Sequence, residues 1–347
     1  MTGASVATVA ATRALRQIAF LLERANEPSY RVKAFRTAAA TVEGLSEGEL
    51  EQRIVAGTLT ELAGIGPATA QAITEGAAGE SPTYLRKLEE AGGTRPVAEG
   101  GVELRAQLRG DLHTHSDWSD GGSPIREMAE AAIALGQSYI ALTDHSPRLT
   151  VANGLTPERL RTQLGIVADL NSELAPFRIL TGIEVDILDD GSLDQEPELL
   201  AELDVVVASV HSKLRMPGAD MTRRMVVAVA NPYVDVLGHC TGRMVTGGRK
   251  RPESEFDADL VFEACRQFGV AVEINSRPER LDPPRRLLRL AVETGCRFSI
   301  DTDAHAPGQL DWQPYGCERA AECGVESGTV INTLEVDELL EWTRRAR

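Results

Sequence analysis

The chain has 347 residues, a formal net charge of −16 and 42% hydrophobic residues. This length allows a large domain beside a smaller one, and the acidic balance argues against a general nucleic-acid coat protein, because phosphate binding depends on an excess of Lys and Arg. The negative charge is unevenly distributed along the chain: residues 1–95 carry ten basic and eleven acidic side chains, whereas residues 96–347 carry 26 basic and 41 acidic side chains.

The sequence opens without an apolar run of the signal-peptide kind, and no segment approaches about eighteen consecutive apolar residues. We therefore expect a soluble, cytoplasmic protein. The five cysteines include no Cys-x-x-Cys pair and are expected to be reduced packing residues.

Residues 1–92 predict a small all-α domain. Leu15, Ile18 and Leu22 recur at helical spacing. In the segment LTELAGIGPATAQAITE, the glycines of Gly64-Ile65-Gly66 allow a tight turn between two short helices, whose backbone N–H groups can meet a DNA phosphate. A simple helical hairpin is the alternative. The candidate DNA-binding residues are Gly64, Gly66, Arg31, Lys33 and Arg36, although three charges on a helix also describe a solvated face.

Residues 93–107, GTRPVAEGGVELRAQ, predict a Gly-rich linker to a second domain at residues 108–347. This domain opens with DLHTHSDWSDG. Residues two apart in an extended chain face the same way, so His113 and His115 can present imidazoles to one metal ion. The Ser-Asp-Gly-Gly turn brings Asp120 back over the end of the strand.

The other four histidines, His145, His211, His239 and His305, each follow a short apolar, β-branched run. The runs are spaced by roughly 30 residues, about one strand-helix unit of an α/β barrel. Together with the runs that hold His113, Glu184 and Asn275 they make seven strand ends. Such ends converge on one face of a barrel, so the pattern predicts one cluster of histidines. Independently placed core histidines are the alternative.

The motifs DLHTHSDWSDG, TDHS, GIEVDI, SVHSK, GHCTGR, EINSRPERLD and TDAH resemble, in this order, those of the PHP (polymerase and histidinol phosphatase) family. The resemblance covers residues 108–347 and is strongest to the carboxyl-terminal PHP domain of bacterial family X DNA polymerases. It implies a distorted (βα)7 barrel, an α/β fold, preceded here by the small all-α domain.

The segment IAFLLERANEPSYRVKAFRTAAATVEGL and the hairpin resemble the small amino-terminal domain of the same polymerases. That domain often carries a Schiff-base lysine after the hairpin, where this chain has Gln71 and Ala72. No polymerase body stands between the two domains. We therefore expect neither lyase nor polymerase activity.

The resemblance also implies the metal ligands, and all nine are present. His113, His115 and Asp303 would hold one ion and His211 and His239 a second, with Glu184 between them; Asp120, His145 and His305 would hold a third. Imidazoles mixed with carboxylates suit Zn, Mn or Fe better than Mg or Ca. Three divalent ions with three carboxylates leave a charge of about +3, which attracts phosphate and activates water for attack on phosphorus.

Glu184, Asp303 and Arg243 are the candidate catalytic residues, and Arg243, Lys213, Arg277 and Arg280 are the candidate phosphate contacts. For these cations the alternative is a salt bridge to one of the many carboxylates. Asp144 and Asp186 are expected either to orient imidazoles or to cap strand ends.

The pattern favours a metal-dependent phosphoesterase acting on DNA, as a 3′-5′ exonuclease or 3′-end-processing enzyme that reaches DNA ends through its amino-terminal domain. A small-molecule phosphomonoesterase resembling histidinol phosphatase is the main alternative, and a non-catalytic DNA-binding scaffold is a third. Loop shape, the native metal and the oligomeric state are not readable from the sequence.

Overall fold

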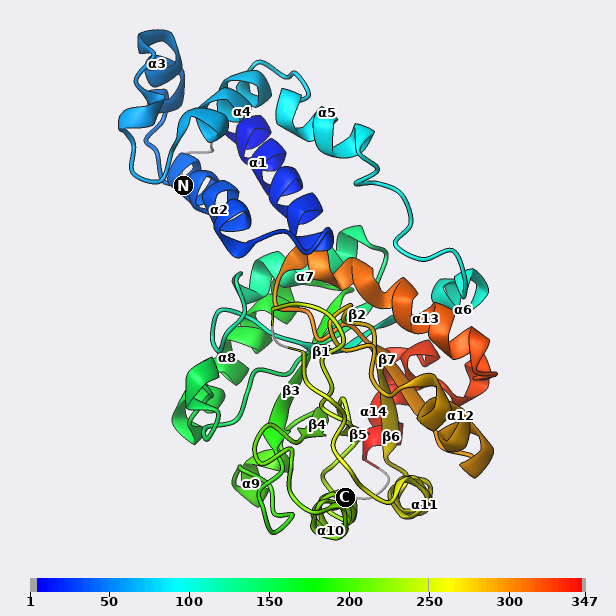
Figure 1. The fold of residues 1–347 in the computed structure, drawn as a ribbon. Helices are drawn as coiled ribbons and strands as arrows, with labels where there is room; N and C mark the ends of the chain where they lie inside the picture. Colours follow the sequence, from blue (N-terminus) through cyan, green and yellow to red (C-terminus); the bar gives the residue numbers. More distant parts are fainter. Residues whose placement is uncertain (1–4, 249, 345–347) are drawn as a thin grey trace. The chain divides into compact units, whose positions relative to one another are not determined.

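A computed structural model describes residues 5–248 and 250–344 of the chain (Figure 1). The chain divides into two compact units, Met1–Pro96 and Val97–Arg347, which are described separately. Among the described residues, no helix is both long enough and apolar enough to cross a membrane.

The first unit is entirely helical. Ser5 caps its first helix by accepting a hydrogen bond from the backbone N–H of Thr8. Leu15, Ile18 and Leu22 then pack against α2 and α4 in one apolar core. Its elements are α1 (Val6–Arg24), α2 (Ser29–Glu43), α3 (Glu49–Ala56), the 3-10 turn η1 (Leu59–Glu61), α4 (Pro67–Ala77) and α5 (Thr83–Glu90).

The predicted hairpin lies between η1 and α4. Gly64 has φ +79°, and a Cβ atom there would lie 2.4 Å from Cγ2 of Thr37, so only glycine fits this turn. Ile65 is buried beneath the turn. Gly66 caps α4, and Pro67 occupies its first turn, where a missing N–H costs no hydrogen bond.

The second unit contains one sheet of seven parallel strands, paired in sequence order from β1 to β7. A parallel bridge between Thr114 and Ala304 joins the two edges of this sheet and nearly closes the barrel. The prediction of a seven-stranded barrel preceded by an all-helical region is confirmed. The strands are β1 (Gly110–Thr114), β2 (Tyr139–Leu142), β3 (Arg178–Asp186), β4 (Val205–Ser209), β5 (Val236–Leu237), β6 (Ala271–Asn275) and β7 (Phe298–Asp301).

Helices surround this sheet in Figure 1. One short helix, α6, lies inside the segment 93–107 that was predicted to be a linker. The α-helices of this unit are α6 (Val102–Gln107), α7 (Ile125–Ala134), α8 (Pro157–Leu174), α9 (Pro197–Leu200), α10 (Gly218–Val229), α11 (Ala258–Phe268), α12 (Arg285–Thr294), α13 (Gln313–Glu322) and α14 (Val336–Thr343). Four 3-10 turns are η2 (Thr150–Ala152), η3 (Pro307–Trp312), η4 (Ser327–Thr329) and η5 (Ile331–Thr333).

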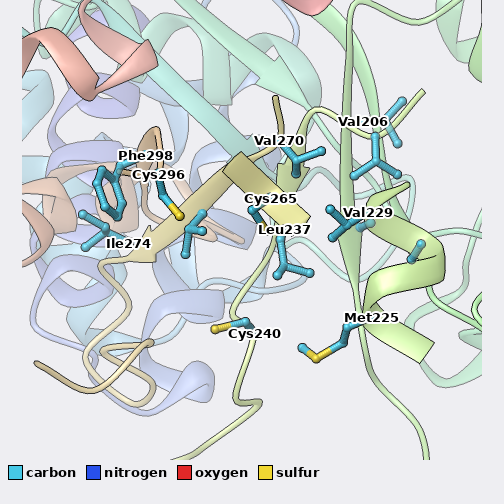
Figure 2. Packing of buried hydrophobic residues seen from close by; sticks show 14 of the residues in the cluster. Val206, Met225, Val229, Leu237, Cys240, Cys265, Val270, Ile274, Cys296 and Phe298 are labelled. Carbon is cyan, nitrogen blue, oxygen red and sulfur yellow. The ribbon is translucent and has the colours of Figure 1, made fainter. Parts of the chain in front are cut away.

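Alternate residues of the strands serve two apolar layers. In β6, Val272 and Ile274 pack with Phe298, Leu237 and the outer helices. Figure 2 shows Ile274 with Phe298 and Leu237 in this layer. A separate cluster joins alternate side chains of six strands, including Val205 and Val207 of β4, to α14, as expected of a barrel interior closed at one end. All five cysteines are buried and free.

Candidate metal centre

The six histidines lie in or just after the strands, at their carboxyl ends. His113 lies within β1, and His145 follows β2 by three residues. The turn after β1 is tight: the N–H of Gly121 donates to the carbonyl of Ser116, and a Cβ atom on Gly121 would lie 2.5 Å from that oxygen. This glycine therefore lets the chain return so that Asp120 faces the cluster.

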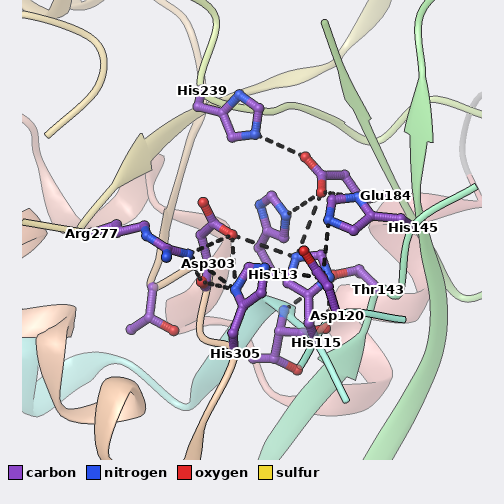
Figure 3. Close-up of polar contacts among 12 residues, drawn as sticks. His113, His115, Asp120, Thr143, His145, Glu184, His239, Arg277, Asp303 and His305 are labelled. Atoms are coloured by element: carbon purple, nitrogen blue, oxygen red, sulfur yellow. Dashed lines mark hydrogen bonds and ion pairs between the residues drawn. The ribbon is translucent and has the colours of Figure 1, made fainter. Parts of the chain in front are cut away.

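Glu184 of β3 is the centre of the cluster (Figure 3). Its carboxylate is buried, with a side-chain exposure of 1%. Each of its oxygens is shared by imidazoles from several strands. Oε1 lies 2.8 Å from Nε2 of His239 and 3.2 Å from Nε2 of His211, while Oε2 lies 2.9 Å from Nδ1 of His145, 3.3 Å from Nε2 of His113 and 3.6 Å from Nε2 of His115.

Two further carboxylates complete the cluster. Asp120 Oδ1 lies 3.4 Å from Nε2 of His145 and 3.3 Å from Nε2 of His305. Asp303 Oδ1 lies 3.5 Å from Nε2 of His115 and 3.6 Å from Nδ1 of His305. The fold thus brings all nine residues of the expected ligand set into one contact network.

Three groups of these residues have donor atoms within 4.8 Å of one another. The groups share members, because His115, His145 and Glu184 each belong to two of them. They differ from the expected division, in which His145 served only one ion and His211 was paired with His239. The groups are His115, Asp120, His145 and His305; His113, His115 and Glu184; and His145, Glu184 and His211.

The donor atoms fit bound cations. Buried polar atoms normally have hydrogen-bond partners. Here, among the described residues, His113 Nε2 and both ring nitrogens of His115 and His211 are buried without one. Neutral imidazoles and carboxylates that converge in this way are the ligand type of zinc, manganese and iron. The residues present therefore fit a metal centre.

Without metal, the charges of the cluster shift each other's pKa values. Burial would lower the pKa of His145, but the carboxylates of Glu184 and Asp120 raise it to about 10. Burial, together with His305 and His145, lowers the pKa of His115 to about 3. Burial would raise the pKa of Glu184, but the surrounding imidazoles hold it well below its usual value. The charges of the protonated imidazoles thus stabilise this buried carboxylate.

Two of the four candidate phosphate contacts face this cluster. Arg280 Nε donates to Oδ2 of Asp303 at 3.0 Å, and its Nη1 is buried without a hydrogen-bond partner among the described residues. Arg277 Nη1 lies 3.1 Å from Nδ1 of His305 and 3.7 Å from Oδ1 of Asp303. Both arginines lie on the loop after β6, the strand that ends at Asn275.

The structure does not bring the other two to the same place. Lys213 is 65% exposed and forms an ion pair with Asp189. Arg243 donates from Nε and Nη2 to the backbone carbonyls of Arg280 and Leu281. Its guanidinium therefore supports the loop that presents Arg280. Nη1 of Arg243 also lies 3.7 Å from Oε1 of Glu253, which is the salt bridge that the sequence analysis gave as the alternative.

The sequence analysis missed Glu273, which contacts the cluster directly. Its Oε1 lies 2.6 Å from Nδ1 of His113, and its Oε2 accepts from the backbone N–H of His239 at 2.5 Å. A carboxylate alternating with Val272 and Ile274 inside an apolar strand was the available signal, because such a side chain must point into the barrel. Glu273 fixes the ring of His113 and so orients its Nε2.

Asp144 and Asp186, each expected to orient an imidazole or cap a strand end, have different contacts in the structure. Asp186 Oδ1 lies 3.4 Å from Nδ1 of His211 and accepts from the backbone N–H of His211 at 3.1 Å, so it orients an imidazole. Asp144 instead accepts hydrogen bonds from Ser116, Ser119 and Gln163. It therefore holds the loop after β1.

In the first unit, the three basic residues predicted to contact DNA differ in exposure and in their partners. Lys33 is exposed. Arg31 donates to the Tyr84 hydroxyl at 2.7 Å. Arg36 forms a two-pronged ion pair with the buried Glu23, with both distances 2.8 Å. The structure therefore engages Arg36 inside the unit and leaves Lys33 at its surface.

Comparison with known proteins relates both units to families. A model described as PHP domain matches residues 111–277, and one described as helix-hairpin-helix domain matches residues 9–80. The chain is 41% identical over 266 residues to the DNA polymerase/3′-5′ exonuclease PolX of Bacillus subtilis (strain 168), a match that covers 76% of this chain and 46% of that protein. The chain thus spans less than half of this relative.

A second relative is matched over nearly its whole length. It is a probable phosphatase of Caldanaerobacter subterraneus subsp. tengcongensis, 30% identical over 262 residues, with 72% of this chain and 95% of that protein covered. Among solved structures, histidinol phosphate phosphatase from Lactococcus lactis, complexed with zinc, L-histidinol and phosphate, is 19% identical. That likeness covers 64% of this chain and 94% of the other, with a TM-score of 0.46. The chain belongs to the PHP family, and it carries a helix-hairpin-helix domain before its PHP barrel.

Proposed function

We propose that this chain is a metal-dependent phosphoesterase that hydrolyses DNA from its 3′ end, as a 3′-5′ exonuclease or a 3′-end-processing enzyme. The observation that carries the phosphoesterase proposal is the convergence of five histidines on Glu184 at the carboxyl ends of the strands, with several buried ring nitrogens that have no hydrogen-bond partner among the described residues. When bound there, divalent ions would supply Lewis acidity and lower the pKa of water.

The protein's own side chains would bind and orient the phosphate. Arg280 has a buried Nη1 that meets no hydrogen-bond partner within residues 5–248 and 250–344, and its Nε donates to Asp303. A phosphoryl oxygen would satisfy that N–H. Arg277, fixed beside His305, would neutralise a second oxygen. Arg243 would act through the loop it supports. Glu184 and Asp303 would keep the imidazoles in place, and Glu273 would hold His113.

The helix-hairpin-helix match to residues 9–80 supports DNA as the substrate. So does the name of the Bacillus subtilis relative, a DNA polymerase/3′-5′ exonuclease. Lys33 and the backbone of the turn at Gly64 and Gly66 would contact phosphates of the duplex. DNA ends would be the partner of the first unit. The cluster would bind three divalent ions, with Mn, Zn or Fe as candidates.

A small-molecule phosphomonoesterase is the second candidate. One support is the probable phosphatase relative, because this chain matches 95% of the length of that protein. The other is the acidic net charge of the chain, which is unusual for an enzyme that acts on nucleic acids. On this proposal the same cluster and the same two arginines would bind a phosphomonoester, and the first unit would not contribute to substrate binding.

One experiment separates the two. Purified, Mn-loaded protein is incubated with a 5′-labelled DNA strand and, separately, with small phosphomonoesters that include histidinol phosphate. Asp303→Asn serves as the control, because it removes a carboxylate charge from the cluster. We expect stepwise shortening of the DNA from its 3′ end and none with the variant. Phosphate release from small esters alone would overturn the DNA proposal in favour of the second candidate.

A further inference from the structure

A broad groove of about 960 Å³ lies between the loop after β5 and the start of α12. Such a volume is at the upper end for pockets that enclose one small ligand. Its lining carries four cationic side chains, Arg243, Lys250, Arg251 and Arg286, against two carboxylates. In a chain with a net charge of −16 this local excess of positive charge is unusual.

The groove also has an apolar wall. Met244, Phe256 and Leu287 are among the residues that line it. The ring of Phe256 is held edge-to-face against Phe262, with 6.5 Å between centroids. Cations that follow a backbone, together with apolar surfaces for base faces, are the combination by which proteins hold single-stranded nucleic acid without reading its sequence.

The loop that forms the groove is tied to the loop that faces the metal centre. The backbone N–H of Val245 donates to the carbonyl of Glu279 at 2.6 Å, and the hydroxyl of Thr246 donates to that of Pro278 at 3.2 Å. Arg280 touches both sites: its side chain meets Asp303, and its carbonyl accepts from Arg243, which lines the groove.

We propose that this groove binds the single-stranded part of the DNA substrate, on the 5′ side of the bond that is cleaved at the metal centre. Lys250, exposed on the loop, and Arg286, at the start of α12, would contact successive phosphates, while the apolar wall would support the bases. A small phosphomonoester has no such extension. This inference rests on the proposed function and specifies its substrate as a polynucleotide strand.

The test compares Lys250→Glu and Arg286→Glu with Arg161→Glu. Arg286 is 62% exposed and paired with Glu253, and Arg161 is 47% exposed and paired with Glu196 on another part of the barrel. Arg161→Glu therefore makes the same change of charge outside the groove. Cleavage is measured on a dinucleotide, a short oligonucleotide and a long one, and equilibrium binding of the long strand is measured in EDTA at several salt concentrations.

We expect KM for the long strand to rise roughly tenfold in each groove variant, with a smaller rise as the strand shortens and little change in Arg161→Glu. The slope of log affinity against log salt should decrease by about 0.7 for each lost phosphate contact. Groove variants that match the wild type, or an equal loss in Arg161→Glu, would overturn the proposal.

The two proposals fail in different ways. If the wild type does not shorten DNA, the exonuclease proposal is wrong, and the binding measurement in EDTA still decides whether the groove holds a strand. If the wild type shortens DNA and all variants shorten strands of every length as well as it does, the exonuclease proposal stands and the groove proposal is wrong.

Discussion

Each unit of this chain buries a glutamate, and the two are balanced in different ways. Glu23 of the helical unit has a side-chain exposure of 2% and meets the guanidinium of Arg36 through both oxygens. Glu184 of the barrel is 1% exposed and is surrounded by imidazoles, several of whose buried nitrogens have no hydrogen-bond partner in the described part of the chain. The permanent cation makes the first carboxylate structural. The imidazoles around Glu184 are titratable and still have nitrogen donors for a metal ion, so this second carboxylate can act with them as a metal ligand.

Glu184→Gln tests this difference where the expected effect is largest. The variant removes the charge on which five imidazoles converge, so we expect bound metal to be lost and phosphoester hydrolysis to fall more than about 100-fold, beyond the usual effect of a residue that only supports a ligand. Elemental analysis after gel filtration measures the metal, and cleavage of labelled DNA measures the activity. Wild-type metal content in the variant would refute the assignment.

Glu23→Gln makes the same change in the helical unit, with the opposite outcome expected. It leaves Arg36, which is only 13% exposed, beside an uncharged amide, so the free energy of unfolding of this unit should fall by about 3 kcal/mol while the metal content stays the same. Urea denaturation followed by circular dichroism measures it. Glu27→Gln is the matched control: its partner Arg31 is 34% exposed, so we expect a loss below about 1 kcal/mol.

Glu273→Gln sharpens the comparison within the barrel. Glu273 contacts the ring nitrogen of His113 that faces away from Glu184, so its loss should weaken metal binding by about 10- to 100-fold without removing a ligand. Competition with a chelator gives the affinity. Glu263 is 40% exposed on α11 and is paired with Arg266, so Glu263→Gln is the control and should bind metal as the wild type does. Equal affinities in both variants would contradict the role of Glu273.

Gly64→Ala tests the helical unit without touching the metal centre. A Cβ atom at this residue meets Thr37 at 2.4 Å in a left-handed conformation, whereas a Cβ atom on Gly66 would meet no atom of the described residues within 4 Å. We expect Gly64→Ala to destabilise the unit by about 1–2 kcal/mol or more and to weaken DNA binding. Gly66→Ala should change stability much less. Thermal unfolding and DNA anisotropy measure both, and equal effects would contradict this reading of the turn.

The smallest expected effect is the release of protons when metal binds. The carboxylates of Glu184 and Asp120 overcome the effect of burial and raise the pKa of His145 to about 10, so the metal-free protein holds a proton there at pH 8. A metal ion needs the neutral imidazole, and binding should release about one proton or more, with affinity rising as the pH rises toward 10. Calorimetry in buffers of different ionisation enthalpy counts these protons. Metal binding without proton release would contradict the raised pKa.

The helices of the first unit and the barrel were accessible from the sequence, because both follow from local periodicity. Leu15, Ile18 and Leu22 mark one helix face, and the apolar runs recur at the spacing of one strand and one helix. Since the carboxyl ends of parallel strands share one face, the position of each histidine in its own run was enough to predict that the six would meet. The same motifs carried the resemblance to the PHP family, which is confirmed.

The roles of the cations and supporting carboxylates were decided only by the tertiary structure. Arg243 and Arg280 belong to similar loops, but one guanidinium meets backbone carbonyls and the other meets Asp303. The partner of Glu273 is His113, 160 residues away. The groove likewise joins two loops that are distant in sequence. Local pattern sets where a side chain lies on its own element, whereas its partner depends on which other elements pack beside it.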